Sequence, residues 1–228
     1  WYKRRGNNDN VFIGNDFSYA AAHGLEMTFS FGNRILANNF EGNSICGIWG
    51  GFSQDFLIAH NTFSKNGFAG YGMERGDVNI DHGSNNRLTQ NSHSDSACGV
   101  HLWELATSFS QKPWGNANLT PPMKENLVVF SQFNRNGVDF HTRGRVRIKV
   151  HKNNHDDAKQ PNDIAKESVI HIIQDAAEES GTFQFTLDDL AKHLQVDPNP
   201  VGARRHLAGR QNILMTEWGP WDHVSPRD

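Results

Sequence analysis

The strongest constraint on this chain is a repeat with a period of 22 to 23 residues that begins at Asn10. Each copy has a short apolar run and ends in Phe or His, and four of the five copies have a second Asn between the two. A Gly followed by an apolar residue recurs between the copies, for example at Gly24, Gly47 and Gly99. The five copies are Asn10–Phe17, Asn33–Phe40, Asp55–Phe63, Asn86–His93 and Asn126–Phe133.

A fixed period of this length, with short apolar runs and Asn/Gly corners, is typical of a solenoid of stacked strands. Asn and Gly tolerate the positive φ of tight corners, and stacked Asn side chains are expected to hydrogen-bond from coil to coil. No apolar run is long enough for an amphipathic helix, and a leucine-rich horseshoe needs a denser Leu spacing. The sequence predicts an all-β fold: a right-handed parallel β-helix of about five to six coils, with a small helical C-terminal extension.

Bulk composition limits the partners. A net charge of −3 and a pI of about 6.5 give no global basic field, so we expect no nucleic-acid partner. No apolar run approaches the roughly 18 residues of a membrane-spanning helix, so we expect no membrane span. The chain opens at Trp1 and coil-like sequence follows almost at once. We therefore expect a fragment or processed form, monomeric, whose localisation signals lie outside this sequence.

The two cysteines, Cys46 and Cys98, each precede a Gly in their own rung. The repeat places them two rungs apart, and a coil spacing of ~4.8 Å separates their Cα atoms by roughly 9–10 Å. A disulfide needs less than ~7 Å. We predict two free thiols that fill space in the core.

The strand that follows each Gly carries the candidate chemistry. Alternation directs Leu25, Ile48 and Val100 inward, and the residues between them outward. The outward column then consists of Glu26, Trp49, His101, Trp103, Asp139 and His141.

Two rungs are longer than the others. The third rung admits two alignments, and the spacing to Asn86 favours Val78–Asp81 as its strand, with Gly67–Asp77 inserted before it. That insertion carries Glu74 and Arg75, while the excess of the fourth rung, residues 104–124, carries Trp114. Long loops on a regular scaffold are usually functional, so we expect a groove between these two insertions.

Paired carboxylates in such a groove suit glycoside hydrolysis, inverting at about 6.5–9.5 Å and retaining at about 5 Å. Asp81 and Asp139 lie two rungs apart with His101 between them, and His101 or His141 is a candidate acid or base. A lyase needs Arg or Lys beside the abstracted proton, and only Arg75 is close. The predicted catalytic residues are Asp81, His101, Asp139, Glu26 and Glu74, and the predicted substrate-binding residues are Trp49, Arg75, His82, Trp103, Trp114 and His141.

Two other interpretations stay open at this point. Any single outward Asp or Glu also suits an ordinary solvated surface, and an outward Trp also suits packing under a loop. A metal site built from Asp81, His82, His93 and His101 lacks tight ligand spacing, so we expect no cofactor, with Ca²⁺ as the one alternative.

The composition changes after residue 150. Arg145–Val150 alternates basic and apolar residues and is expected to end the solenoid, giving a β-helix over residues 1–154. Apolar spacing predicts a helix over Ile164–Glu179, and Thr186–Asp189 resembles a capping box that opens a helix through Leu194. Residues 155–228 are thus expected to form a helical extension, with Asn212–Asp222 starting a further β domain.

The repeat resembles the right-handed β-helix proteins of the pectate-lyase-like superfamily, especially large bacterial exported members. Residues 10–150 carry the resemblance, together with stretches such as Cys46–Ser53, Asp81–Asn86 and Glu217–Asp222. It implies the fold, a secreted or periplasmic location and an oligo- or polysaccharide partner, but no catalytic residue, because this scaffold carries lyases, hydrolases, epimerases and non-enzymes. The calcium and arginine pattern of pectate lyases is not visible. Two hypotheses remain: a polysaccharide-degrading hydrolase (or lyase), and a non-catalytic module for carbohydrate binding or periplasmic or cell-surface interaction.

Overall fold

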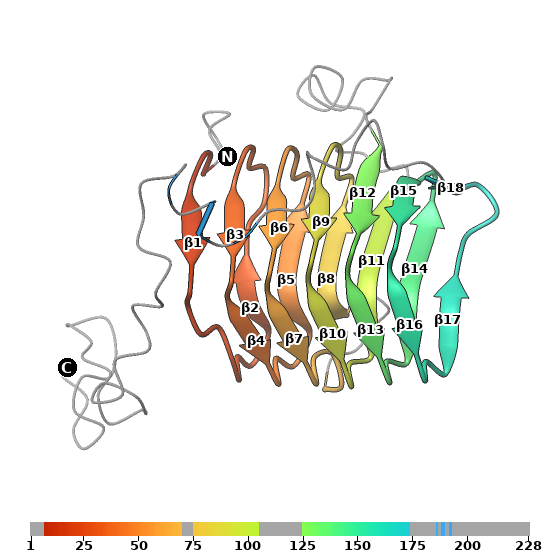
Figure 1. Ribbon diagram of the computed structural model, residues 1–228, viewed down its shortest axis with the longest axis horizontal. Helices are drawn as coiled ribbons and strands as arrows, with labels where there is room; N and C mark the ends of the chain where they lie inside the picture. The colour runs from red at the N-terminus through yellow and green to blue at the C-terminus, as the bar shows by residue number, and fades with distance from the viewer. Residues whose placement is uncertain are drawn as a thin grey trace.

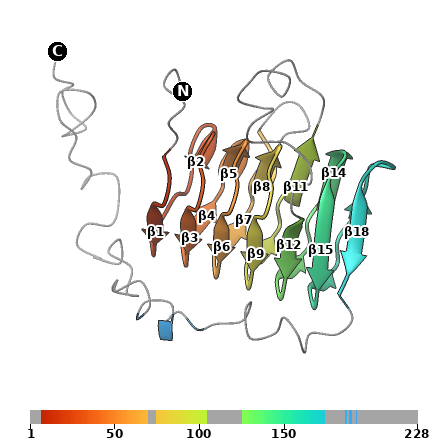
Figure 2. The same cartoon turned by 90° about the horizontal axis from the view of Figure 1, so that it is seen from above.

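A computed structural model describes residues 7–69, 75–104 and 125–173, together with residues 186, 188, 189 and 192. Figures 1 and 2 show strands stacked side by side along one axis, with β1 at one end and β18 at the other. They form three sheets in which each strand pairs in parallel with its equivalent one coil further on. Five coils contribute one strand to each sheet. Among the described residues, no helix is both long and apolar enough to cross a bilayer.

Sheet A contains β1 (Val11–Ile13), β3 (Arg34–Leu36), β6 (Leu57–Ala59), β9 (Arg87–Thr89), β12 (Asn126–Val129), β15 (Arg147–His151) and β18 (Val169–Ile172). Sheet B contains β4 (Asn39–Glu41), β7 (Thr62–Ser64), β10 (Ser92–Ser94), β13 (Gln132–Asn134) and β16 (Asn154–Asp156). Sheet C contains β2 (His23–Glu26), β5 (Cys46–Gly51), β8 (Gly76–Asp81), β11 (Cys98–Glu104), β14 (Val138–Gly144) and β17 (Gln160–Asp163).

The register confirms the repeat alignment of the irregular third rung. Val78 pairs with Ile48 on one side and with Val100 on the other, as the spacing to Asn86 predicted. The insertion ends earlier than predicted, because Gly76 and Asp77 already belong to β8.

Ladders of Asn side chains hold consecutive coils together. In one ladder Asn38 donates its backbone N–H to Asn61 Oδ1 (2.9 Å), and Asn61 donates its own to Asn91 Oδ1 (3.0 Å). The fifth copy has Ser131 in place of this Asn, and the Ser131 hydroxyl accepts from the Asn91 backbone N–H at 3.2 Å. The coil-to-coil hydrogen bonding predicted from the Asn columns is therefore confirmed.

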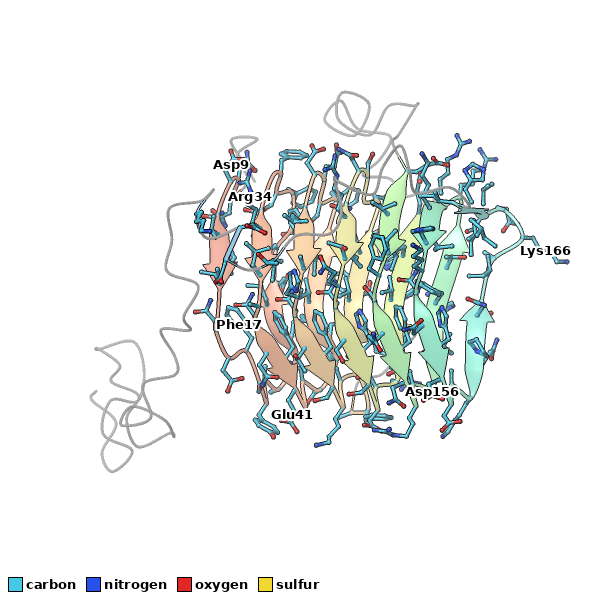
Figure 3. The ribbon with its side chains drawn as sticks, in the orientation of Figure 1. Asp9, Phe17, Arg34, Glu41, Asp156 and Lys166 are labelled. Atoms are coloured by element: carbon cyan, nitrogen blue, oxygen red, sulfur yellow. The ribbon has the colours of Figure 1, made fainter. Side chains whose placement is uncertain are left out.

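A stack of rings runs through the core at the centre of sheet B, starting at Phe17, which Figure 3 labels near the β1 end. Neighbouring rings lie nearly parallel, with centroids 4.7–5.2 Å apart. Two members are histidines: His93 lies between Phe63 and Phe133, and His155 follows Phe133. The stack is Phe17, Phe40, Phe63, His93, Phe133 and His155.

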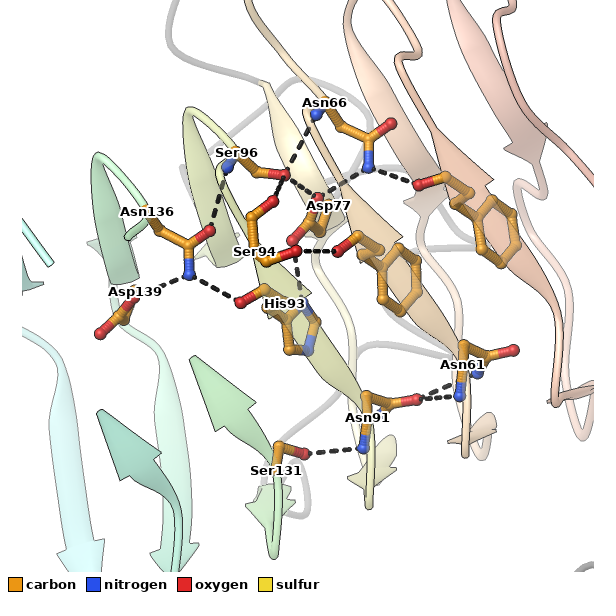
Figure 4. A network of polar contacts seen from close by, with 12 residues as sticks. Asn61, Asn66, Asp77, Asn91, His93, Ser94, Ser96, Ser131, Asn136 and Asp139 are labelled. Carbon is orange, nitrogen blue, oxygen red and sulfur yellow. Dashed lines mark hydrogen bonds and ion pairs between the residues drawn. The ribbon is translucent and has the colours of Figure 1, made fainter. Parts of the chain in front are cut away.

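The two stacked histidines pair with aspartates at the second position of a sheet C strand. His93 Nδ1 lies 3.0 Å from Asp77 Oδ2, and His155 Nδ1 lies 2.8 Å from Asp139 Oδ2. Figure 4 shows Asp77 between Asn66, Ser96 and His93, and Asp139 beside Asn136. Asp139 was predicted to face outward; that prediction is wrong, because its carboxyl group is fully buried and bonded inside the solenoid.

Three other coils have Gly where these two have Asp, and Phe where they have His. Gly24 goes with Phe40, Gly47 with Phe63 and Gly99 with Phe133. A Cβ placed on Gly47 would lie 2.9 Å from the Phe63 ring, and one on Gly99 would lie 2.8 Å from the Phe133 ring. A larger residue at this corner therefore requires a smaller ring in the stack, and Asp with His satisfies both the space and the hydrogen bond.

The cysteines are as predicted. Cys46 and Cys98 are both buried free thiols. Cys46 pairs in register with Gly76, and Cys98 lies on the other side of that glycine. Burial raises the pKa of the Cys98 thiol well above its usual value.

The solenoid continues beyond the predicted boundary at residue 154. β16, β17 and β18 extend all three sheets, and Ile170 pairs with Ile148 of β15. The helix predicted over Ile164–Glu179 is wrong at Val169–Ile172, because pairing with β15 overrides an apolar spacing that suits either element.

The helical C-terminal extension as a whole stays a prediction, because the structure describes only four residues beyond residue 173. The Asp189 backbone N–H donates to Thr186 Oγ1 at 3.1 Å, which is the expected N-cap bond, and residues 188, 189 and 192 are helical. The end of this helix at Leu194 and the strand predicted over Asn212–Asp222 lie outside the described residues.

Candidate functional site

The outer face of sheet C brings most of the predicted site residues into one aligned column. Val78, Ile80, Val100 and Leu102 of β8 and β11 are in the core, so the residues between them face out. Register pairs then connect Glu26, Trp49, Asn79, His101, His141 and Asp163 from β2 to β17. A second column beside it connects Gly51, Asp81, Trp103 and Arg143.

The predicted residues do not all meet in one place. Trp49, His101, Trp103, His141 and Asp81 share this face, and His82 follows Asp81 directly. Glu26 lies exposed on β2 at one end of the column, and Arg75 lies exposed just before β8. Glu74 and Trp114 lie outside the described residues.

An acidic and imidazole cluster forms where β8 and β11 end. His82 Nδ1–H donates to Asp81 Oδ1, and both residues are almost fully buried. Because Asp81 pairs with Trp103, the next residues of the two strands, His82 and Glu104, are also neighbours. Burial raises the pKa of the Glu104 carboxyl group against the opposing effects of His82 and Arg145, and the Asp81 carboxylate adds to the increase.

Asn79 links two rings of the outward column. Its side-chain Oδ1 accepts from Trp103 Nε1–H at 2.8 Å, and its Nδ2 lies 3.1 Å from His101 Nδ1. His101 is fully buried, and burial, with His141 and Arg143 nearby, lowers its pKa to about 3. His101 is therefore a neutral ring near pH 7.

His101 also stacks on His141 of the next coil, with ring centroids 4.2 Å apart and planes 9° from parallel. His141 Nε2 lies 3.5 Å from Asp163 Oδ2, and the Asp163 carboxylate is about half exposed. The column thus passes from a buried neutral imidazole to a His–Asp pair that reaches solvent.

Aromatic rings border these polar groups. Trp49 and Trp103 have centroids 6.1 Å apart, and His23 stacks on Trp49 at 5.5 Å. The Arg143 guanidinium lies 6.0 Å from the Trp103 ring centroid. Partly exposed Trp rings suit ligands that have one apolar face and one polar face.

Four residues on or next to this face were missed by reasoning from the sequence. Asn79 lies in the strand that the spacing to Asn86 favoured but was not among the predicted site residues, and Arg143 continues the period of Asp139 and His141. Glu104 was assigned to the insertion although it ends β11. No sequence feature pointed to Asp163, because the residues of its strand were expected to belong to a linker.

The residues that the structure describes contain no group of three or more His, Cys, Asp or Glu side chains arranged to hold a metal ion. The cluster with Asp81 has two carboxyl groups and one imidazole that is already bonded to Asp81.

Comparison with known families agrees with this architecture. A family model described as a right handed beta helix region matches residues 3–111. The chain is a right-handed parallel β-helix protein. The fold of the pectate-lyase-like superfamily fits its three parallel sheets, and this family suggests a carbohydrate-active or related β-helix protein. Neither the search of curated proteins nor the search of solved structures gave a match.

Proposed function

We propose that this β-helix protein is a glycoside hydrolase that binds a polysaccharide along the outer face of sheet C. The observation that carries the proposal is the position of Glu104, whose pKa is raised by burial and by the Asp81 carboxylate, near the hydrogen-bonded Asp81–His82 pair. Two neighbouring carboxyl groups, one of them with a raised pKa, are typical of the acid and base of glycoside hydrolysis.

Glu104 is the proposed general acid. Its raised pKa keeps the carboxyl group protonated closer to neutral pH, so that it can protonate the oxygen of the departing sugar. Asp81 is the proposed base or nucleophile, because the His82 N–H donates to it and holds the carboxylate in place. His82 then acts by orienting Asp81.

The tryptophans support binding of the chain on either side of these carboxyl groups. Trp103 pairs with Asp81 in the sheet, and Trp49 lies 6.1 Å from Trp103 between ring centroids. Sugar rings stack on such surfaces through their C–H faces while their hydroxyl groups meet the flanking polar side chains. A polymeric substrate of this kind is consistent with a secreted or periplasmic protein, which we also propose.

The test is reducing-sugar release from a panel of plant, algal and bacterial polysaccharides. Glu104→Gln and Asp81→Asn are each expected to lower the rate on any cleaved glycan by about 100-fold or more. Glu26→Gln is the matched control, because Glu26 lies on the same face but is exposed and away from the cluster. Full activity of both cluster variants would refute the assignment.

Arg143 supports a second candidate, polysaccharide lyase activity. This arginine faces out beside Trp103, where a lyase would need a cation next to the abstracted proton. Absorbance of an unsaturated product separates lyase from hydrolase chemistry in the same screen. Glycan binding measured by calorimetry without any product would instead favour the non-catalytic binding module.

A further inference from the structure

The hydrogen bonds around Asn79 determine which nitrogen of His101 carries the proton. The indole Nε1 of Trp103 is a donor only, so the Asn79 atom 2.8 Å from it must be the amide oxygen. The remaining Asn79 group is an NH₂, also a donor only, and it lies 3.1 Å from His101 Nδ1. His101 Nδ1 must therefore accept, and the proton of the neutral ring is on Nε2.

The same contact prevents His101 from becoming an imidazolium. A second proton on Nδ1 would face the Asn79 NH₂ group, donor against donor. From β14, His141 and Arg143 disfavour a positive charge on this ring, and the nearer of the two carboxylates in the column, Asp163, is beyond His141. His101 is thus unsuited to the acid–base role that its position in the column first indicated.

The Nε2–H of His101 is buried and has no hydrogen-bond partner among the described residues. Burying a donor without a partner is unfavourable, so native structures rarely retain one without a reason. His101 is held in place on two sides, by Asn79 and by the stacked His141 ring, which fixes the direction of this N–H.

We propose that His101 is a binding residue that donates its Nε2–H to an oxygen of the saccharide, with Asn79 and Trp103 as the positioning residues that fix its tautomer. The proposal rests on the proposed carbohydrate function for the ligand class. It assigns His101 to recognition of a sugar oxygen, and it leaves proton transfer to Asp81 and Glu104.

The tautomer is tested without any ligand, by long-range proton–nitrogen NMR correlation spectra of the histidine rings across a pH titration. The expected spectrum has the His101 proton on Nε2 and shows no titration of this ring near its ordinary pKa. Asn79→Asp should move the proton to Nδ1 and raise the pKa of His101, because a carboxylate accepts from both rings. An Nδ1–H tautomer or an ordinary titration of His101 in the unmodified protein would overturn the positioning relay.

Use of the donor is tested by calorimetric binding of cello-, xylo-, manno- and galacturono-hexasaccharides. His101→Phe keeps a flat ring against His141 but removes the N–H, and it is expected to weaken binding of the bound oligosaccharide by about 10-fold. His101→Gln, which retains a donor, should recover part of this loss. His151→Phe is the matched control, because His151 is also buried with an unpartnered Nε2 but lies on sheet A.

The outcomes separate the two levels of the proposal. Binding by His101→Phe equal to that of the unmodified protein refutes the donor role while the carbohydrate function stands. If none of the four oligosaccharides binds and no polysaccharide of the panel is cleaved, the carbohydrate function and the donor role both fail, and the NMR result still decides the relay.

Discussion

Exchanging the buried Asp77–His93 pair for Gly and Phe is expected to be far less harmful than either single change. Both side chains are fully buried, and Asp77 also accepts from Asn66 Nδ2 (2.8 Å) and Ser96 Oγ (2.6 Å). His93→Phe alone leaves a buried carboxyl group without its imidazole and places a larger ring against the Asp77 Cβ. Breaking one partner of a buried pair costs about 3–5 kcal/mol.

Asp77→Gly alone leaves His93 Nδ1 without an acceptor, in a ring whose Nε2 already lacks a partner among the described residues. The lost hydrogen bond costs about 1–3 kcal/mol, and the flexible glycine adds about 0.5–1 kcal/mol. The double variant reproduces the Gly47–Phe63 arrangement of the neighbouring coil, and Asn66 keeps its bond to Phe40 O at 2.9 Å. We expect it to lose about 2 kcal/mol or less, because apolar replacement of a buried pair is often nearly neutral.

The measurement is a double-mutant cycle on the free energy of unfolding, from urea denaturation followed by circular dichroism. The expected coupling between positions 77 and 93 is about 3 kcal/mol or more. The exposed Arg135–Asp95 ion pair provides the control cycle, for which a small coupling is expected. If the double variant loses as much stability as the two single variants added together, the steric and hydrogen-bond argument for the Gly–Phe and Asp–His pairs is refuted.

Three other perturbations test the Asn ladder, the glycine packing and the Glu104 carboxyl group. Asn61→Ala removes donors to Ile35 O and Asn91 Oδ1 and the acceptor for Asn38, and should cost about 3 kcal/mol of unfolding free energy, against little change for the exposed neighbour Thr62→Ala. Gly47→Ala places a Cβ 2.7 Å from Asp77 O and should lower stability by about 1–3 kcal/mol in the same assay, and an unchanged denaturation midpoint would contradict this packing. The folded-state pKa of Glu104 is raised above its unfolded value, so its contribution to stability is complete below the unfolded pKa and is lost as pH rises through the folded pKa. Cleavage activity that needs the protonated acid should fall over the same rise in pH, and Glu104→Gln should flatten the pH dependence of stability.

The repeat made most of the solenoid predictable, including the alignment of the third rung and the distance that keeps Cys46 and Cys98 apart. Those features depend on the spacing between the sequence copies, because in a solenoid the equivalent positions of successive copies become register partners. Asp139 was misplaced because simple alternation fails at the corner that opens each sheet C strand. Three of the six described sheet C strands have Gly there, so in those coils no side chain reveals the direction of the position. The available signal was the coordinated exchange of Gly–Phe for Asp–His, which marks two positions that share one interior space.

The sequence predicted which face of the solenoid carries the candidate site. Trp49, Trp103, His101 and Asp81 follow from the period of the strands, whereas the roles of Asn79 and Glu104 depend on which atoms meet across coils. The helix predicted over Ile164–Glu179 failed for a related reason: its spacing is compatible with both structures, and the edge of β15 offers a partner strand.

The hydrogen-bond distances in the Asn ladder hardly depend on how many residues separate its members in the sequence. The bonds from Asn38 to Asn61, from Asn61 to Asn91 and from Asn91 to Ser131 measure 2.9, 3.0 and 3.2 Å, although they cross 23, 30 and 40 residues of sequence. Segments of very different length can therefore be exchanged between these anchors without shifting the coils above or below. Such a scaffold can acquire new specificities by loop transplantation, in evolution or in the laboratory, because its stability comes from the coils and not from the exchanged segments.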